Sequence, residues 1–148
     1  MNLESEKRKK LQTTESNEEW KTMIVTSSKP YGVLRGMLKK WKTVGIVACN
    51  SCARACETGG REKMEELATR LKSDGFQVVD TELVPLACNV DSMKKPDYKA
   101  DYLVVLACDS GVFTLQSLFP GKIIVSALDT IGLGARDVQG NIYIMKKF

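Results

Sequence analysis

The stretch that sets the fold class is residues 44–73, VGIVACNSCARACETGGREKMEELATRLKS. It opens on a continuous apolar run, residues 44–48, which has the length of a buried strand. Residues 62–73 follow as an amphipathic helix, and its inner face carries Met64, Leu67, Ala68 and Leu71. A loop rich in cysteine and glycine joins the two. The stretch therefore predicts a strand, a loop and a helix that packs back on the strand.

The same alternation continues toward the C-terminus. Apolar runs at 76–80, 102–107, 123–127 and 142–145 predict further strands. A helix is predicted over 112–119, with Asp109 and Ser110 as its N-cap residues. Strands that alternate with helices predict an α/β fold: a small doubly wound, mostly parallel sheet with helices on both faces. We expect one such domain over residues 23–148, preceded by a polar flexible tail over residues 1–22.

Between the tail and this pattern, two more elements are predicted. MIVT at residues 23–26 predicts a short edge strand, and a helix is expected to begin near Pro30. Apolar residues recur at helical spacing along this helix and predict a stripe that packs in the core: Val33, Leu34, Met37, Leu38 and Trp41.

The chain has 148 residues, five cysteines and no histidine. The lack of histidine excludes Ser-His-Asp and Cys-His nucleophile arrangements and every His-ligated metal centre. Because five is odd, the cysteines cannot all be paired in disulfides within one chain. Any chemistry at this chain is therefore expected to rest on sulfur, on carboxylates and amines, or on a bound cofactor.

Every cysteine lies at or beyond the end of a predicted strand. Cys49 follows the first buried run and opens a C-x2-C-x3-C pattern with Cys52 and Cys56. Cys88 lies in the connection after the second run, and Cys108 directly follows the third. Since the carboxyl ends of parallel strands meet at one edge of a sheet, the five thiols are expected to gather there.

Thiolate-only ligation suits a [4Fe–4S] cluster or a Zn²⁺ ion held by four thiolates. Structural zinc commonly uses two paired-cysteine knuckles, whereas this chain has one pair, a third cysteine close by and two remote ones. That asymmetry favours the iron–sulfur cluster, with zinc as the alternative. A metal-free thiol–disulfide role for Cys49 and Cys52 is the third alternative.

The spacing leaves the choice of four ligands open. Cys52 and Cys56 are the firmest candidates on sequence grounds. Cys49 and Cys108 are expected to be neighbours, because a 2-1-3 strand order places the strands they follow side by side. Cys88 is then either the fourth ligand or the spare thiol.

The sequence holds two glycine-rich segments that are candidate binding sites. Gly59 and Gly60 precede a helix and are candidates to offer backbone N–H groups to an anion or to cluster sulfur. A plain flexible loop accounts for them equally well. Gly132, Gly134 and Gly140 do not keep the dinucleotide-binding spacing, so we do not predict a nucleotide site there.

Charge and hydropathy restrict partners and location. Residues 1–43 carry 10 Lys and Arg against 5 Asp and Glu, and the rest carry 12 against 13. The basic excess, including KRKK at residues 7–10, predicts a solvated tail, and no nucleic-acid partner is expected. No stretch approaches the roughly 20 apolar residues of a membrane span, and the N-terminus lacks the apolar core of a secretory signal. We therefore expect a cytoplasmic protein.

Residues 23–129 resemble the cysteine-rich domain of the methylenetetrahydrofolate reductase C-terminal family, whose stand-alone form is the small subunit of the acetogen-type enzyme. The likeness is carried by MIVTSSKP, VACNSCARACETGGREKMEELATRL, Cys88 and DYLVVLACDSGV. It implies an iron–sulfur electron-transfer subunit that pairs with a flavin-bearing reductase subunit, with all five cysteines matching family cysteines. This chain has no cysteine after Cys108, so the family's second cysteine-rich segment and a second metal centre are not expected.

Overall fold

The centre of the fold is β2 (Val44–Cys49), which is buried at every position. It pairs in parallel with β3 (Val78–Val84) on one side and with β4 (Tyr102–Leu106) on the other. β5 (Ile123–Ser126) pairs in parallel with β4, so the strand order is β3-β2-β4-β5. The continuous apolar runs are therefore the strands of a parallel sheet, because its middle strands must be apolar on both faces.

The computed structural model describes residues 21–93 and 97–148. Of the tail predicted over residues 1–22, the first 20 residues lie outside the described residues, and these include the basic run at 7–10. Residues 21 and 22 belong to β1 (Lys21–Ser28), so this strand begins two residues before the strand predicted at 23–26.

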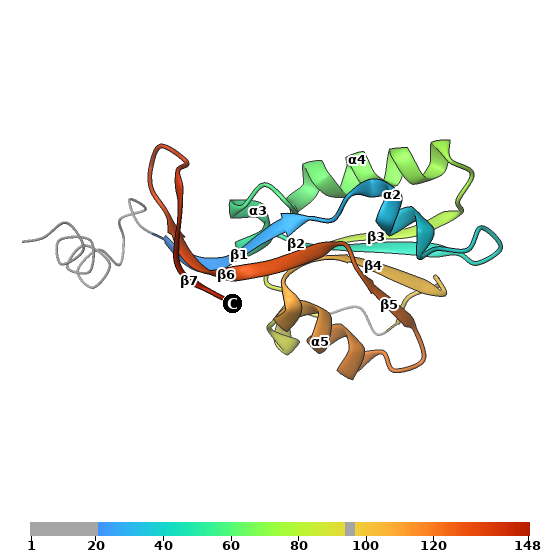
Figure 1. The fold of residues 1–148 in the computed structure, drawn as a ribbon. Coiled ribbons are helices and arrows are strands. Elements are labelled where there is room, and N and C mark those ends of the chain that lie inside the picture. The colour runs from blue at the N-terminus through green and yellow to red at the C-terminus, as the bar shows by residue number, and fades with distance from the viewer. Residues whose placement is uncertain (1–20, 94–96) are drawn as a thin grey trace, which may run out of the picture.

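Helices cover the parallel sheet on both faces. α4 (Gly60–Ser73) lies on one face and α5 (Asp109–Leu118) on the other (Figure 1). Met64, Ala68 and Leu71 of α4 are buried against the sheet, as the helical spacing predicts. The remaining helices are short: α2 (Tyr31–Gly36), α3 (Cys52–Ala55) and a 3-10 turn, η1 (Val90–Ser92). The mixed α/β class predicted from the alternation of strands and helices is thus confirmed.

Three strands form a second, antiparallel sheet that the sequence did not predict. Its order is β1-β6-β7, with β6 at Leu128–Arg136 and β7 at Ile142–Lys147. Only Ala127 separates β5 from β6, so the chain passes from the parallel sheet into the antiparallel one without a loop. The structure therefore has a four-stranded parallel sheet and not the single sheet that was expected, because the first and last predicted strands lie in the antiparallel sheet.

The glycines of β6 have a packing role. A Cβ atom on Gly132 would lie 2.2 Å from the carbonyl oxygen of Lys146, and one on Gly134 would lie 2.3 Å from that of Tyr143. The backbone of β7 crosses β6 too closely for any side chain, and the pairing shifts register between Leu133 and Gly134. These glycines, which do not fit a nucleotide-binding motif, are explained by this close approach.

The apolar stripe predicted from Pro30 onward is wrong at three of its five positions. Leu34 and Leu38 are buried, but Val33, Met37 and Trp41 are 52%, 41% and 76% exposed. α2 ends at Gly36, and the residues that follow no longer keep a helical spiral. The end of the helix accounts for the exposure of Met37 and Trp41, whereas Val33 lies within α2 and faces solvent.

Other element bounds shift by a few residues. The strand predicted at 76–80 runs instead from Val78 to Val84. α5 begins at Asp109, so Cys108, not Asp109 or Ser110, occupies the N-cap position. Within the part of the chain that the structure describes, no helix has the length and apolar character to cross a bilayer.

Candidate metal centre

The carboxyl ends of the central strands bring two cysteines together. Cys49 is the last residue of β2, and Cys108 follows β4 by two residues. Ala48 pairs with Leu106 in the parallel register, so the chain leaves both strands at the same level. Both cysteines are buried. The 2-1-3 order expected from the sequence is the observed order β3-β2-β4, with Cys49 and Cys108 following adjacent strands.

The loop after β2 folds into one turn of helix, α3, which carries Cys52 at its start and Cys56 at its C-cap. The amide of Cys56 donates to the carbonyl of Cys52 at 3.0 Å. Glu57 then takes a positive φ of 58°, an uncommon conformation for a side chain of this type, and reverses the chain. Cys52 and Cys56 are each half-buried.

The two glycines after this turn are required by close packing at Gly59 and by the backbone conformation at Gly60. A Cβ atom on Gly59 would lie 2.6 Å from that of Ala53 and about as close to two backbone oxygens, those of Leu106 and Cys49, at 3.0 and 3.1 Å. The N–H of Gly59 donates to the Ala53 carbonyl at 2.9 Å. Gly60 has a φ of +79°, which favours glycine. The binding role predicted for Gly59 and Gly60 is untested, but the amide of Gly59 is already engaged within the chain, and neither glycine lies in an open loop.

Strand β1 borders the cysteine turn on its outer side (Figure 1). The hydroxyl of Thr58 donates to the Ala53 carbonyl at 3.1 Å, and it lies 2.7 Å from the hydroxyl of Thr26 in β1. Since a hydroxyl carries one proton, Thr26 is the donor in this buried pair. The sequence predicts β1 as a strand but carries no signal that it lies beside the cysteines, because that contact is long-range.

Cys88 joins the group from the connection after β3. The amide of the preceding residue, Ala87, donates to the sulfur of Cys49 at 3.5 Å. The carbonyl of Cys88 accepts from the hydroxyl of Thr114 in α5, the helix that Cys108 caps. A Cβ on Gly111 of that helix would lie 2.9 Å from the Cβ of Ala87, so the helix and this connection are in close contact. Cys88 is exposed, so this side of the group faces solvent.

The cysteines influence one another electrostatically. Burial raises the pKa of the Cys52 thiol, and Cys108, Cys49 and Cys56 raise it further, while a backbone hydrogen bond from Ile24 lowers it. Burial also raises the pKa of Cys88, followed by the influence of Cys108, Cys49 and Cys52. Coulomb interactions of this kind fall with distance. Cys49 and Cys108 are therefore close enough to both Cys52 and Cys88 to act on the pKa of each thiol.

All five cysteines are free thiols. Across the described parts of the chain, no three cysteine, aspartate or glutamate side chains converge tightly enough to hold a single metal ion. The donor set itself consists of sulfur atoms, which suit soft metals such as iron in clusters and zinc. Glu57 and Asp109, the acidic neighbours of Cys56 and Cys108, are both exposed. The amide of Asp109 donates to the hydroxyl of Thr130 in β6.

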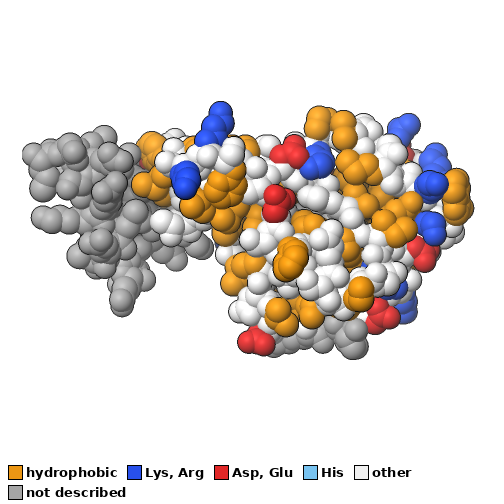
Figure 2. All heavy atoms as spheres, turned by 60° about the horizontal axis from the view of Figure 1, so that its bottom comes forward, with side chains coloured by type: hydrophobic (Ala, Val, Ile, Leu, Met, Phe, Trp, Pro, Cys, Tyr) orange, Lys and Arg blue, Asp and Glu red, His pale blue; other side chains and the backbone are white. Residues whose placement is uncertain are grey.

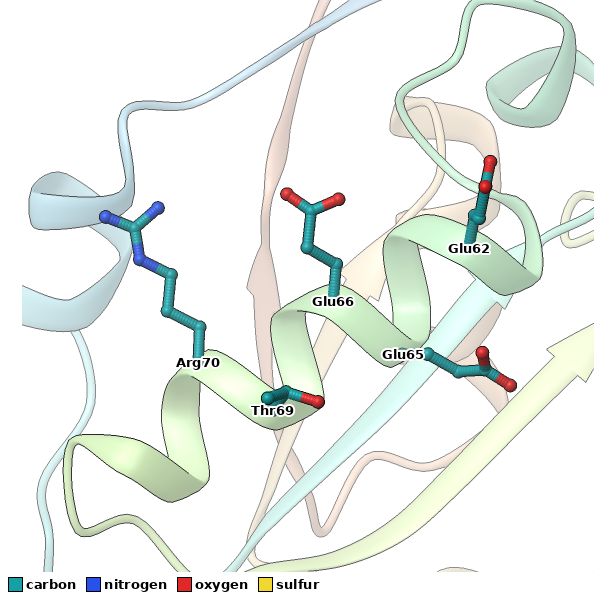
Figure 3. A pocket seen from close by; sticks show the side chains of 5 residues that line it. All are labelled: Glu62, Glu65, Glu66, Thr69 and Arg70. Carbon is teal, nitrogen blue, oxygen red and sulfur yellow. The ribbon is translucent and has the colours of Figure 1, made fainter.

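A shallow hollow runs along α4, apart from the cysteine loops (Figure 3). One helix supplies its whole lining, and the side chains concerned are Glu62, Glu65, Glu66, Thr69 and Arg70. Sequence analysis assigned no function to these residues. An acidic helix surface of this kind is typical of a solvated face.

Comparison of the chain with protein-family models, with curated proteins and with solved structures finds no match. The fold and the site define a mixed α/β protein with five free thiols, of which Cys49 ends β2 and Cys108 follows β4 at the carboxyl ends of the parallel sheet.

Proposed function

We propose that this chain is an iron–sulfur electron-transfer protein that holds one [4Fe–4S] cluster at the carboxyl edge of the parallel sheet. The observation that carries the proposal is the gathering of Cys49, Cys52, Cys88 and Cys108, with Cys56 beside them, from three loops that are far apart in the sequence. Free cysteine in a protein core is usually scattered, because it behaves there as a small apolar residue. Several thiols gathered from separate loops instead favour a shared metal centre.

The arrangement of the thiols supports a cluster over a single zinc ion. A tetrahedral zinc site with Zn–S bonds of about 2.3 Å holds its sulfur atoms about 3.8 Å apart. In a [4Fe–4S] cluster each thiolate binds a different iron atom, so the ligands surround a larger body. Thiols supplied as one close pair, a third cysteine nearby and two remote ones fit the second arrangement better than the two paired knuckles of structural zinc.

The chain's own residues have three tasks at such a site. The thiols must lose their protons, because thiolates are the ligands, and the shared negative charge then favours a cationic iron core. The Ala87 amide, which donates to the sulfur of Cys49, and the Ile24 backbone, which lowers the pKa of Cys52, both stabilise charge on sulfur. The buried strand ends keep water from the inner side of the group.

We further propose that the partner is a flavin-bearing redox subunit of the methylenetetrahydrofolate reductase type, working in the cytoplasm. A bound [4Fe–4S] cluster supplies one electron at a time, so a two-electron flavin reaction needs two successive transfers. Cys88 is exposed and lies at the outer side of the thiol group, which gives a neighbouring redox centre a short path. The sequence resemblance described above supplies the flavin in this proposal.

Metal analysis of the full chain, purified without oxygen, tests the proposal. We expect about four iron and four acid-labile sulfide per chain, a brown colour and an EPR signal on reduction by one electron. A colourless protein with about one zinc per chain would establish the alternative, a four-thiolate zinc interaction module without redox function. A metal-free protein whose activity depends on Cys49 and Cys52 alone would instead show thiol–disulfide chemistry. Either of the last two results refutes the iron–sulfur proposal.

A further inference from the structure

We propose that the loop between α2 and β2, residues 39–42 with the sequence KKWK, binds the surface of an anionic lipid bilayer. In this proposal Trp41 enters the interface between water and the acyl chains, and the lysines beside it contact the headgroups. The proposal is independent of the proposed metal centre, because it rests on other residues at the opposite end of the parallel sheet.

Trp41 has the highest exposed fraction, 76%, of the large apolar side chains in the described part of the chain. Its loop is a tight turn, closed by a hydrogen bond from the amide of Lys42 to the carbonyl of Lys39 at 3.1 Å. A solvated loop gains nothing from a tryptophan at such a position, since the indole is largely apolar. The exposure of Trp41 therefore indicates a surface that covers it in a complex.

The end of α2 adds two more apolar side chains to this surface. Val33 lies within α2, and Met37, its C-cap residue, keeps helical backbone angles, so the two residues share one side of the helix. Both are exposed. A Cβ atom on Gly32 or Gly36 would meet nothing within 4 Å, so no other segment covers the helix at these positions. The apolar stripe that the sequence predicts for the core is thus partly an outer surface, which leads into the loop of Trp41.

The lysines of the loop carry positive charge that the protein does not neutralise. Within residues 21–93 and 97–148, neither Lys39 nor Lys40 forms a salt bridge. Their ammonium groups lie over aromatic rings, 5.2 Å from the ring centre of Trp41 for Lys39 and 5.8 Å from that of Phe76 for Lys40. Figure 2 shows Lys and Arg side chains beside hydrophobic ones at the right end of the molecule, where this loop lies in Figure 1.

The carboxylates nearest to the loop are occupied within the protein. Asp74 accepts a hydrogen bond from the hydroxyl of Tyr31 and lies 3.7 Å from the guanidinium of Arg35. Asp101 accepts from the amide and the hydroxyl of Thr43, both at 3.1 Å. Lys39 and Lys40 are therefore left to attract an anion from outside the chain.

The chemistry of this surface fits a bilayer better than a nucleic acid. Tryptophan settles at the headgroup level of membranes, and lysines beside it are attracted by anionic lipids. Single-stranded nucleic acid instead stacks its bases on a platform of aromatic rings. Val33 and Met37 offer no such ring, but they can enter the boundary of the acyl chains together with the indole.

Binding at this end leaves the cysteines accessible. β2 begins at Val44, directly after the loop and Thr43, and ends at Cys49. Five residue steps along a parallel strand span about 17 Å, so the loop and the thiols lie at opposite ends of the sheet, as Figure 1 shows for the loop and α3. A chain bound through Trp41 therefore presents its cysteine edge away from the bilayer.

Co-sedimentation of the full chain with vesicles tests the proposal. The vesicles contain about three parts phosphatidylcholine to one part phosphatidylserine, or phosphatidylcholine alone. We expect binding to the anionic vesicles and much weaker binding to the neutral ones. The chain has two tryptophans, so Trp20→Phe leaves Trp41 as the single fluorophore, and its emission should shift to shorter wavelength on binding.

Three variants locate the binding surface. Trp41→Ser should weaken binding at least about tenfold, because the indole no longer leaves water. Lys39→Gln with Lys42→Gln should weaken it about 25-fold, at about fivefold for each lysine. Lys146→Gln with Lys147→Gln makes the same change in charge on β7 and should have an effect of about twofold or less. Circular dichroism checks that each variant folds, as expected for substitutions at exposed or half-buried positions.

Three results would overturn the inference. The first is a parent chain that does not bind anionic vesicles. The second is binding that Trp41→Ser and the Lys39 and Lys42 pair leave unchanged, which would assign it to another part of the chain, such as the basic run at residues 7–10. The third is a chain that binds a single-stranded oligonucleotide through Trp41 but no vesicle, which would make the loop a nucleic-acid site. None of these results depends on metal content, so the proposed function is tested separately.

Discussion

The two sheets of this protein bury their strands very differently. In the parallel sheet, every residue of β2 and β4 is buried, because α4 and α5 cover both faces. In the antiparallel sheet, every residue of β7 is exposed, although IYIM is strongly apolar. Figure 2 shows hydrophobic side chains gathered at the left end of the described residues, where β6 and β7 lie in Figure 1. The buried core is therefore formed mainly around the parallel sheet, and the antiparallel sheet contributes less to it.

The cysteine turn lies where the two sheets meet. α3 contacts β1 of the antiparallel sheet and β2 of the parallel sheet. The candidate site therefore has two sides. One is made by the buried ends of β2 and β4, and the other depends on the packing of the cysteine turn against β1. Cys49 and Cys108 belong to the first side, and Cys56 belongs to the second.

A matched pair of leucine substitutions should give the largest difference in stability between the two sheets. Leu103 of β4 is 0% exposed, and Leu133 of β6 is 42% exposed. Leu103→Ala removes buried methyl groups and leaves a cavity, so we expect it to lower the free energy of unfolding by about 2–5 kcal/mol. Leu133→Ala is expected to change it by about 0.5 kcal/mol or less. Urea denaturation of both variants measures the difference, and equal losses would show that the two sheets are equally important to the core.

Gly134 tests how closely β7 is attached to β6. Gly134→Ala would place a Cβ atom 2.3 Å from the carbonyl oxygen of Tyr143 and 2.7 Å from a methyl group of Val25. Since a backbone oxygen cannot give way as a flexible side chain does, we expect a loss of about 1–3 kcal/mol and displacement of β7. Gly121→Ala is the control, because a Cβ atom there meets nothing within 4 Å. Thermal unfolding compares the two, and a Gly134 variant as stable as the control would contradict the close approach.

The Thr26–Thr58 hydrogen bond tests the attachment of the cysteine turn to β1. Thr58→Val leaves the buried hydroxyl of Thr26 without this partner, so we expect a loss of about 1 kcal/mol. Replacing both threonines by valine removes the donor and the acceptor together, and the double variant should be more stable than the sum of the two single losses predicts. Denaturation of the four proteins completes the cycle, and strictly additive losses would mean that the two hydroxyls do not interact.

The parallel sheet could be predicted from the sequence because its strands are encoded locally. The runs VGIVA and YLVVL are apolar without interruption, and both fall on buried central strands. β6 could not be predicted in the same way, because Gly132 and Gly134 interrupt its apolar pattern. Those glycines are required by the backbone of β7, so their reason lies in a contact between strands and not in the segment itself.

The candidate site likewise has one part that follows from local sequence and one part that depends on long-range contacts. The ends of β2 and β4 follow from the apolar runs, and they place Cys49 and Cys108 on adjacent strands as expected. The orientation of Cys56 depends on Ile24, which lies 32 residues away in the sequence. Spacing within the C-x2-C-x3-C pattern carries no information about that contact.

The burial of β2 along its whole length has a consequence for the dynamics of the site. A strand paired on both sides and covered on both faces exposes its amides only when the whole protein unfolds, whereas an exposed edge strand opens locally at much lower free energy. In hydrogen–deuterium exchange, the amides of β2 should be among the last to exchange and those of β7 among the first. Cys49 is therefore expected to end a segment that rarely opens, and its thiol would be anchored to one of the most protected strands of the chain.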